Sequence, residues 1–174
     1  MTDIAAARPR HTPRKETHTV EIKVPRHLED LPAGTTFGTA GRTVTEADIV
    51  TFAGLSGDYA PMHVDDAWSR ANHPFGSRFA HGMLVASMSY ALRTPMLDHL
   101  HVVAWLQTTR RFVAPVRPGD TVTATWTIAE ARERASDHRT GVVTADIEVR
   151  NQDGVVVQQG SDVWLVERRP EEDR

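Results

Sequence analysis

Two residues with complementary proton chemistry, Asp58 and His63, lie close together in a short segment that contains Pro61. Carboxylate and imidazole are side chains that exchange protons with water near neutral pH. A turn at this point can fold back so that both side chains face one small volume. The spacing therefore indicates an acid–base pair. Taken singly, Asp58 has a plainer interpretation as a turn residue bonded to its own backbone, and His63 as a half-buried histidine.

A second segment whose residues could take part in a reaction begins at Gly82. The run Gly82–Leu92 is apolar nearly all the way around, which is typical of a buried helix, and it is too short to cross a membrane. The first backbone N–H groups of such a helix have no acceptor within it, and they carry the positive end of the helix dipole. Glycine at this point lets a ligand approach the backbone closely. These features predict a site for a carbonyl oxygen that gains negative charge, as in an enolate.

Local patterns predict the helices that position these residues. Thr45 is expected to cap a helix, with Asp48 three residues later as in a capping box, and Gly54 and Gly57 are expected to end it. A second short helix is predicted over residues 65–72. The segment with the acid–base pair therefore follows directly on a helix.

The C-terminal half alternates between apolar and polar residues, which is typical of strands. Apolar side chains share one face over 122–128 and over 143–149, and Asp153-Gly154 indicates a hairpin turn. With residues 102–113, these segments predict four long strands joined by short turns, and hence an antiparallel sheet. A buried helix with such a sheet predicts an α+β fold in which the sheet curls around the helix. The hot-dog arrangement is the simplest form of that fold.

The composition is that of an ordinary globular protein. The 174 residues suit one domain, which we place at 20–167, between a flexible N-terminal tail at 1–19 and a frayed C-terminal end at 168–174. A net charge of −3 and the lack of long apolar runs argue against nucleic acid or membrane as partners, and a cytoplasmic protein is expected. The sequence has no Cys, so disulfides, thiolate catalysis and sulfur-ligated metals are excluded.

Neither a metal nor another cofactor is predicted. His99 and His101 with His73 or His81 could in principle bind zinc, but no pair of histidines has the spacing of ligands on one helix face. Nine histidines make such coincidences common, so ordinary surface and loop histidines are the preferred interpretation. The sequence contains no glycine-rich phosphate-binding motif, and no nucleotide cofactor is expected.

Three segments in order, Gly57–His63, Ala80–Leu84 and Phe112–Asp120, resemble the signatures of the MaoC-like family, which includes the R-specific enoyl-CoA hydratases. The resemblance covers roughly residues 36–167. It implies a hot-dog homodimer that acts on an acyl thioester such as an acyl-CoA.

The same resemblance implies roles for individual residues. Asp58 and His63 would activate water as the catalytic pair. The Gly82 N–H would stabilise the oxyanion, and His81 would lie beside it at the substrate.

At two positions the chain departs from the family pattern. Ala60 stands where the family usually has Asn, so a polar group that helps to order the turn or the substrate is missing. Some members hold the catalytic Asp with a serine of the central helix, and that position falls on Tyr90, with Ser89 and Ser87 nearby. A tyrosine hydroxyl could replace this contact with a different geometry.

The predicted reaction is reversible hydration of a trans-2-enoyl thioester to a 3-hydroxyacyl thioester, the R enantiomer by resemblance. A hot-dog thioesterase would instead attack C1 and release free thiol, and a non-catalytic binding module would keep the cleft without the chemistry. The segment with Asp58, Pro61 and His63 favours hydration, because only water addition needs this matched pair on a single turn. Three arginines have two equal interpretations, as contacts to CoA phosphates or as solvated residues on strand edges: Arg110, Arg111 and Arg117.

Overall fold

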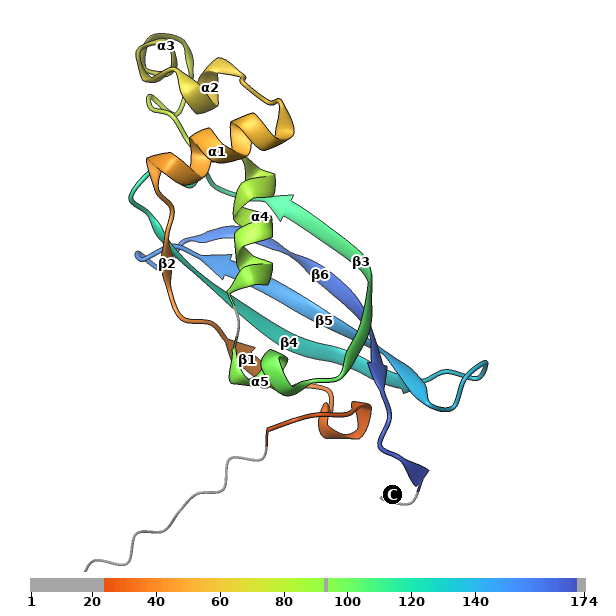
Figure 1. Ribbon diagram of the computed structural model, residues 1–174. Helices are drawn as coiled ribbons and strands as arrows, with labels where there is room; N and C mark the ends of the chain where they lie inside the picture. The colour runs from red at the N-terminus through yellow and green to blue at the C-terminus, as the bar shows by residue number, and fades with distance from the viewer. Residues whose placement is uncertain (1–23, 93, 172–174) are drawn as a thin grey trace, which may run out of the picture.

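The structure is a computed structural model that describes residues 24–92 and 94–171 (Figure 1). The tail predicted for residues 1–19 lies outside the described residues. Within the described part, an antiparallel sheet curves around one central helix (Figure 1).

The four long strands predicted for the C-terminal half are all present: β3 (Val102–Phe112), β4 (Thr121–Glu133), β5 (Thr140–Arg150) and β6 (Val156–Glu167). Two short strands, β1 (Thr36–Gly38) and β2 (Arg42–Thr43), pair with β4. The sheet has the order β1-β4-β5-β6-β3, which leaves β3 as an edge strand. The predicted turn between β5 and β6 is confirmed, with Gly154 at a φ of 77°.

Helix α4 (Gly82–Ala91) lies against the inner face of the curved sheet (Figure 1). In the first part of β4 every second residue is buried: Val122, Ala124, Trp126 and Ile128. From the helix, Leu84, Val85 and Met88 are buried in the same core. The structure therefore confirms the prediction of an α+β fold in which the sheet curls around a buried helix.

Three helices follow one another beyond the N-terminal end of α4 (Figure 1): α1 (Glu46–Ser56), α2 (Pro61–Val64) and α3 (Asp66–Asn72). The capping box is confirmed, because the Thr45 hydroxyl accepts the Asp48 N–H at 3.1 Å and the Asp48 carboxylate accepts the Thr45 N–H at 2.8 Å. The prediction that Gly54 ends α1 is wrong. One glycine inside a helix costs only about 1 kcal/mol, so α1 continues to Gly57, whose φ of 76° ends it.

The elements that the sequence did not predict are short: the strands β1 and β2, the helix α2, the 3₁₀ helix η1 (Leu28–Asp30) and the helix α5 (Pro95–His99). At the C-terminal end, Arg168 contacts Glu29 at 3.0 Å and Arg169 contacts Asp30 at 2.7 Å. The segment predicted to be frayed from residue 168 thus begins with two residues held by ion pairs. Their partners, Glu29 and Asp30, lie in η1, which contacts β5.

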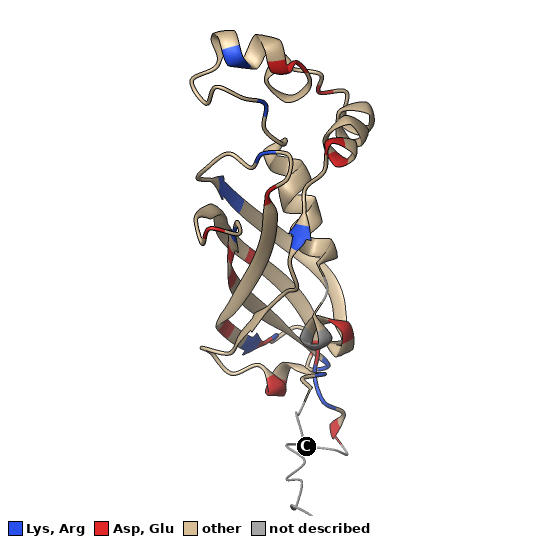
Figure 2. Cartoon of the chain, turned by 90° about the vertical axis from the view of Figure 1, so that its left-hand side faces the viewer, with Lys and Arg blue, Asp and Glu red and all other residues tan. Residues whose placement is uncertain are grey.

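Charged residues of both signs are scattered over helices, strands and loops (Figure 2). Within residues 24–92 and 94–171, no helix has the length and apolar character needed to span a membrane.

Candidate active site

The turn after α1 presents the carboxylate of Asp58. The Asp58 N–H donates to the Ser56 hydroxyl at 3.2 Å, and the Asp58 Oδ1 accepts the Ala60 N–H at 3.1 Å. This is an Asx turn, in which a side chain bonds the backbone two residues on. Ala60 therefore contributes through its backbone, which orients Asp58 although its methyl group offers no polar contact. The Asp58 side chain remains 51% exposed and keeps its second oxygen, Oδ2, available.

His63 is held in one tautomer by the backbone. Pro61 begins α2, and two residues later the buried His63 ring places Nδ1 2.8 Å from the Phe79 carbonyl oxygen. A carbonyl can only accept, so Nδ1 carries the hydrogen and the neutral ring has its lone pair on Nε2. That Nε2 lies 3.9 Å from Asp58 Oδ2. The structure thus brings the predicted pair together, at a distance too long for a direct hydrogen bond.

The surroundings of His63 favour its neutral form. Burial is the largest effect, and it lowers the pKa of His63 below its ordinary value, although the hydrogen bond to Phe79 and the nearby Asp58 act in the opposite direction. The neighbouring imidazole of His81 lowers the pKa further. A neutral imidazole with a free Nε2 can accept a proton.

His81 connects the turn to the central helix. Its ring is stacked on that of His63, with the two ring centres 3.9 Å apart. Its Nε2–H donates to the backbone carbonyl of Asp58 at 2.9 Å. Because His81 directly precedes α4, it fixes the position of the Asp58 turn relative to the first turn of that helix.

Asp58, His63 and His81 each offer a possible metal-ligand atom within 4.8 Å of the others. The hydrogen bond from His81 to the Asp58 carbonyl requires a hydrogen on Nε2, which leaves no lone pair there for a metal. Of the two ring nitrogens that lie within 4.0 Å of Asp58 Oδ2, only His63 Nε2 keeps a lone pair, so these atoms are fewer than the three protein ligands of a usual catalytic zinc site. The cluster is therefore better suited to moving protons.

The histidines considered for zinc are not brought together. His101 lies 3.1 Å from a Glu167 oxygen and packs on His27, whereas His73 packs on Phe79.

The N-terminal turn of α4 opens onto a pocket of about 270 Å³. The first helical hydrogen bond of α4 runs from the Val85 N–H to the His81 carbonyl, so the Gly82 and Met83 N–H groups precede it. A Cβ atom at Gly82 would come within 2.7 Å of the Phe112 ring, which explains the glycine. The pocket is lined by both Gly82 and His63, so the candidate oxyanion donor and the candidate base face the same space.

Sequence reasoning missed one polar residue of this pocket. Gln158 of β6 is 2% exposed, lines the pocket and donates from Nε2 to the Gly82 carbonyl at 2.7 Å. The signal was present, because Gln158 and Asp162 both occupy inward-facing positions on β6, in step with the buried Trp164 and Val166.

Tyr90 and Ser89 lie away from the acid–base pair. The Tyr90 hydroxyl contacts Thr108 and lies 3.4 Å from the carboxylate of Asp162. The Ser89 hydroxyl donates to the Ala86 carbonyl of its own helix at 2.6 Å. The Tyr90 hydroxyl thus does not replace the family's serine contact to the catalytic Asp. The longer tyrosine side chain reaches the sheet and forms its hydrogen bonds there.

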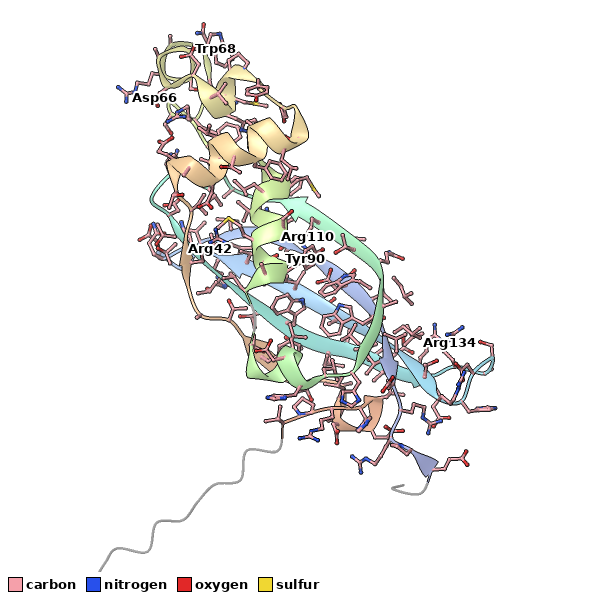
Figure 3. All side chains as sticks on the ribbon, in the orientation of Figure 1. Arg42, Asp66, Trp68, Tyr90, Arg110 and Arg134 are labelled. Atoms are coloured by element: carbon pink, nitrogen blue, oxygen red, sulfur yellow. The ribbon has the colours of Figure 1, made fainter. Side chains whose placement is uncertain are left out.

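The residues of the sheet near Tyr90 show whether Arg110 is available to contact a CoA phosphate. Arg110 lies beside Tyr90 (Figure 3), its side chain is 3% exposed, and it forms two hydrogen bonds with Asp162 at 2.8 and 2.9 Å. Arg110 is therefore occupied in the protein interior, not at a phosphate. Arg117 donates to the Ser77 hydroxyl at 2.8 Å on an exposed loop.

A sequence profile of the MaoC like domain matches residues 30–152, more than half of the chain. The chain belongs to the MaoC-like family. A relative from Rhodospirillum rubrum, named (R)-specific enoyl-CoA hydratase, is 39% identical over 102 residues, which are 59% of this chain and 69% of the relative. A relative from Methylorubrum extorquens, named 3-hydroxybutyryl-CoA dehydratase, is 35% identical over 104 residues, or 60% of this chain and 64% of the relative.

Solved structures agree with this family. The MaoC-like dehydratase of Rhodospirillum rubrum has a TM-score of 0.73 and 30% identity, with 84% of this chain and 99% of that chain covered. A Mycobacterium tuberculosis protein described as having a double hotdog fold has a TM-score of 0.73 and 18% identity, with 83% of this chain and 45% of that chain covered. At that identity the likeness concerns the fold alone. This MaoC-like protein thus has the hot-dog fold.

Proposed function

We propose that this MaoC-like protein catalyses the reversible hydration of a trans-2-enoyl-CoA to the (R)-3-hydroxyacyl-CoA. The observation that carries the proposal is the pair formed by Asp58 Oδ2 and His63 Nε2, 3.9 Å apart, beside the first turn of α4 and its pocket. The names of two relatives, an (R)-specific enoyl-CoA hydratase and a 3-hydroxybutyryl-CoA dehydratase, support this reaction and its acyl-CoA substrate.

In this proposal the substrate carbonyl lies at the N-terminus of α4. The N–H groups of Gly82 and Met83 come before the first helical hydrogen bond and sit at the positive end of the helix dipole. A thioester oxygen held there is stabilised as it gains charge, which draws electrons away from C3. The pocket between Gly82 and the apolar side chains of β3 and β6 takes the acyl chain.

One water molecule fits between the two catalytic groups, because a gap of 3.9 Å allows one oxygen to hydrogen-bond both. It donates one hydrogen to Asp58 Oδ2 and the other to His63 Nε2, and its lone pair faces C3. As the C3–O bond forms, the pair accepts a proton, and the C2=C3 electrons move to the enolate oxygen. The same proton then returns to C2, so that H and OH add across the double bond on one face.

The active assembly in this proposal is a homodimer joined at β3. This strand is the edge of the sheet, and it exposes the large apolar side chains of Val103, Trp105 and Leu106. Exposed strand edges are normally covered or paired. The pocket residues Phe112 and Val113 lie at the end of the same strand, so a partner at β3 would lie close to the site. Sedimentation should give a dimer at micromolar concentration, and a stable monomer would count against it.

The reaction is tested by following the loss of enoyl-thioester absorbance with crotonyl-CoA, together with chiral analysis of the product. Hydration removes the absorbance and leaves the thioester intact. A thiol reagent in a parallel assay would detect CoA release, the result expected of a thioesterase. Binding without either change would identify a non-catalytic module.

A further inference from the structure

Gln158 is the exception in the lining of the pocket. Apart from His63, every other side chain that lines the pocket is apolar or, at Gly82, absent. Gln158 comes from the inward face of β6 and is only 2% exposed. An amide buried in apolar surroundings is costly unless its donor and acceptor both find partners.

The orientation of the Gln158 amide is fixed by the backbone of α4. The Gly82 carbonyl oxygen lies 2.7 Å from one end of the amide, and because a carbonyl only accepts, that end must be the NH₂ group. The other end, Oε1, is buried and has no hydrogen-bond partner among the described residues. Gln158, which lines this otherwise apolar pocket, therefore carries a buried acceptor that has a fixed direction and no partner among the described residues.

We propose that Gln158 Oε1 accepts a hydrogen bond from a hydroxyl group on the acyl chain, so that the preferred substrate is a hydroxylated enoyl thioester. This inference rests on the proposed hydration reaction and specifies its substrate class. A substrate hydroxyl satisfies Oε1, while the methylene groups around it contact apolar neighbours such as Val85 and Val157. A plain alkyl chain leaves the acceptor buried and unpaired, which is a strong basis for discrimination in enzyme pockets.

The pantetheine arm of CoA also carries N–H donors, but the pocket fits it less well. The arm contains two amides, which need several polar partners when they are buried. The pocket offers only Gln158 and His63 as polar side chains, and His63 is committed to water activation. The apolar lining therefore favours the acyl chain as the source of the donor.

The test compares hex-2-enoyl-CoA with its 4-, 5- and 6-hydroxy counterparts in the absorbance assay. The measured quantity is the ratio of kcat/KM for the best hydroxylated substrate to that for hex-2-enoyl-CoA. In the wild type this ratio should be about ten or more, and Gln158→Met should bring it to one or below. Loss of the contact to Gly82 affects both substrates alike, so it cancels in the ratio. Gln159→Met, on the exposed neighbour, should keep the wild-type ratio.

Three results would overturn the inference. A wild-type ratio of one or below suffices by itself, even if Gln158→Met does not fold. A ratio that stays high in Gln158→Met assigns the preference to another group. An equal fall of kcat/KM for all substrates in Gln158→Met assigns Oε1 to the pantetheine arm or to positioning alone. If the wild type hydrates none of the substrates, the proposed hydration itself fails, which is distinct from hydration without a hydroxyl preference.

Discussion

Two polar clusters lie at α4, one at each end, and they differ in the burial of their carboxylates and in how fully those carboxylates are bonded. At the N-terminal end, Asp58 is 51% exposed and His63 Nε2 faces it across 3.9 Å without a direct bond. Toward the C-terminal end, Asp162 is 0% exposed, and both of its oxygens are bonded to Arg110, at 2.8 and 2.9 Å. Trp126 adds a further donor to Asp162 at 2.9 Å.

This difference indicates that the Asp58 cluster serves a reaction and that the Asp162 cluster stabilises the fold. The Asp162 carboxylate is occupied by groups of the protein, because Oδ1 accepts from Arg110 and Thr108 while Oδ2 accepts from Arg110 and Trp126. The Asp58 cluster keeps one carboxylate oxygen and one imidazole nitrogen free, next to a pocket and a helix N-terminus. Changes in the Asp58 cluster should therefore act on the reaction rate, and changes in the Asp162 cluster should act on the stability of the fold.

The largest expected effect is on rate in the Asp58 cluster. Asp58→Asn and His63→Gln should each lower kcat by about 10²–10⁴-fold, because each removes an acid–base group while it keeps the size of the side chain. The melting temperature should change little for Asp58→Asn, since that side chain is half exposed. Asp66→Asn changes an exposed carboxylate outside the pocket and serves as the matched control. Near wild-type kcat in either site variant would remove that residue from the catalytic pair.

Asp162→Asn should give the opposite result. It leaves the buried Arg110 guanidinium with a neutral amide in place of its carboxylate, and breaking such a buried pair costs about 3–5 kcal/mol. Denaturant unfolding measures this loss. The folded fraction should keep kcat within a few-fold of wild type at low temperature. A variant of normal stability with greatly reduced kcat would show that the Asp162 cluster serves the reaction.

A smaller effect is expected from pH. The pKa of His63 is lowered in the folded protein from its ordinary value of 6.5, chiefly by burial, so the folded state binds this proton less readily than the unfolded state. Its contribution to stability is thus complete above pH 6.5 and is lost as pH falls through the lower, folded pKa. The acid limb of kcat/KM should accordingly lie below pH 6.5, since the base must be neutral.

Unfolding measured between pH 7.5 and 5 checks the sign of this effect. Wild type should lose more stability over that interval than His63→Gln, which has no proton to bind at this position. Equal losses in the two proteins would show that His63 titrates normally, and its burial would then not control its protonation.

The sequence predicted most of the fold because the relevant signals are local or periodic. Alternating residues predict β4 and β5, the Asp153-Gly154 turn predicts β6, and the Thr45–Asp48 capping box predicts the start of α1. The end of α1 was misjudged at Gly54, since a tolerated glycine and a terminating glycine look alike until the backbone torsion is known. Elements of three to five residues, such as η1 and α2, are too short to show a period.

For the site, the sequence predicts the catalytic pair and Gly82 but not the hydrogen bonds that these residues form. The pairing of Asp58 with His63 followed from a motif within one turn. The tautomer of His63 depends on Phe79, and the free oxygen of Gln158 depends on Gly82, which comes from a different element. Such contacts between distant parts of the chain follow only from tertiary packing, so no local pattern reports them.

The smallest effect should come from Tyr90, which tests whether the two clusters are independent. Burial is the largest influence on its pKa and raises it, so the phenol stays protonated and keeps one O–H to donate, with Thr108 and the Asp162 carboxylate within reach. Tyr90→Phe removes that hydroxyl and keeps the ring against Trp105. One neutral hydrogen bond is worth about 1 kcal/mol, so the melting temperature should fall by a few degrees while kcat stays within about twofold. A hundredfold loss of kcat at unchanged stability would instead place the Tyr90 hydroxyl in the reaction, in the role that the family's helix serine has toward the catalytic Asp.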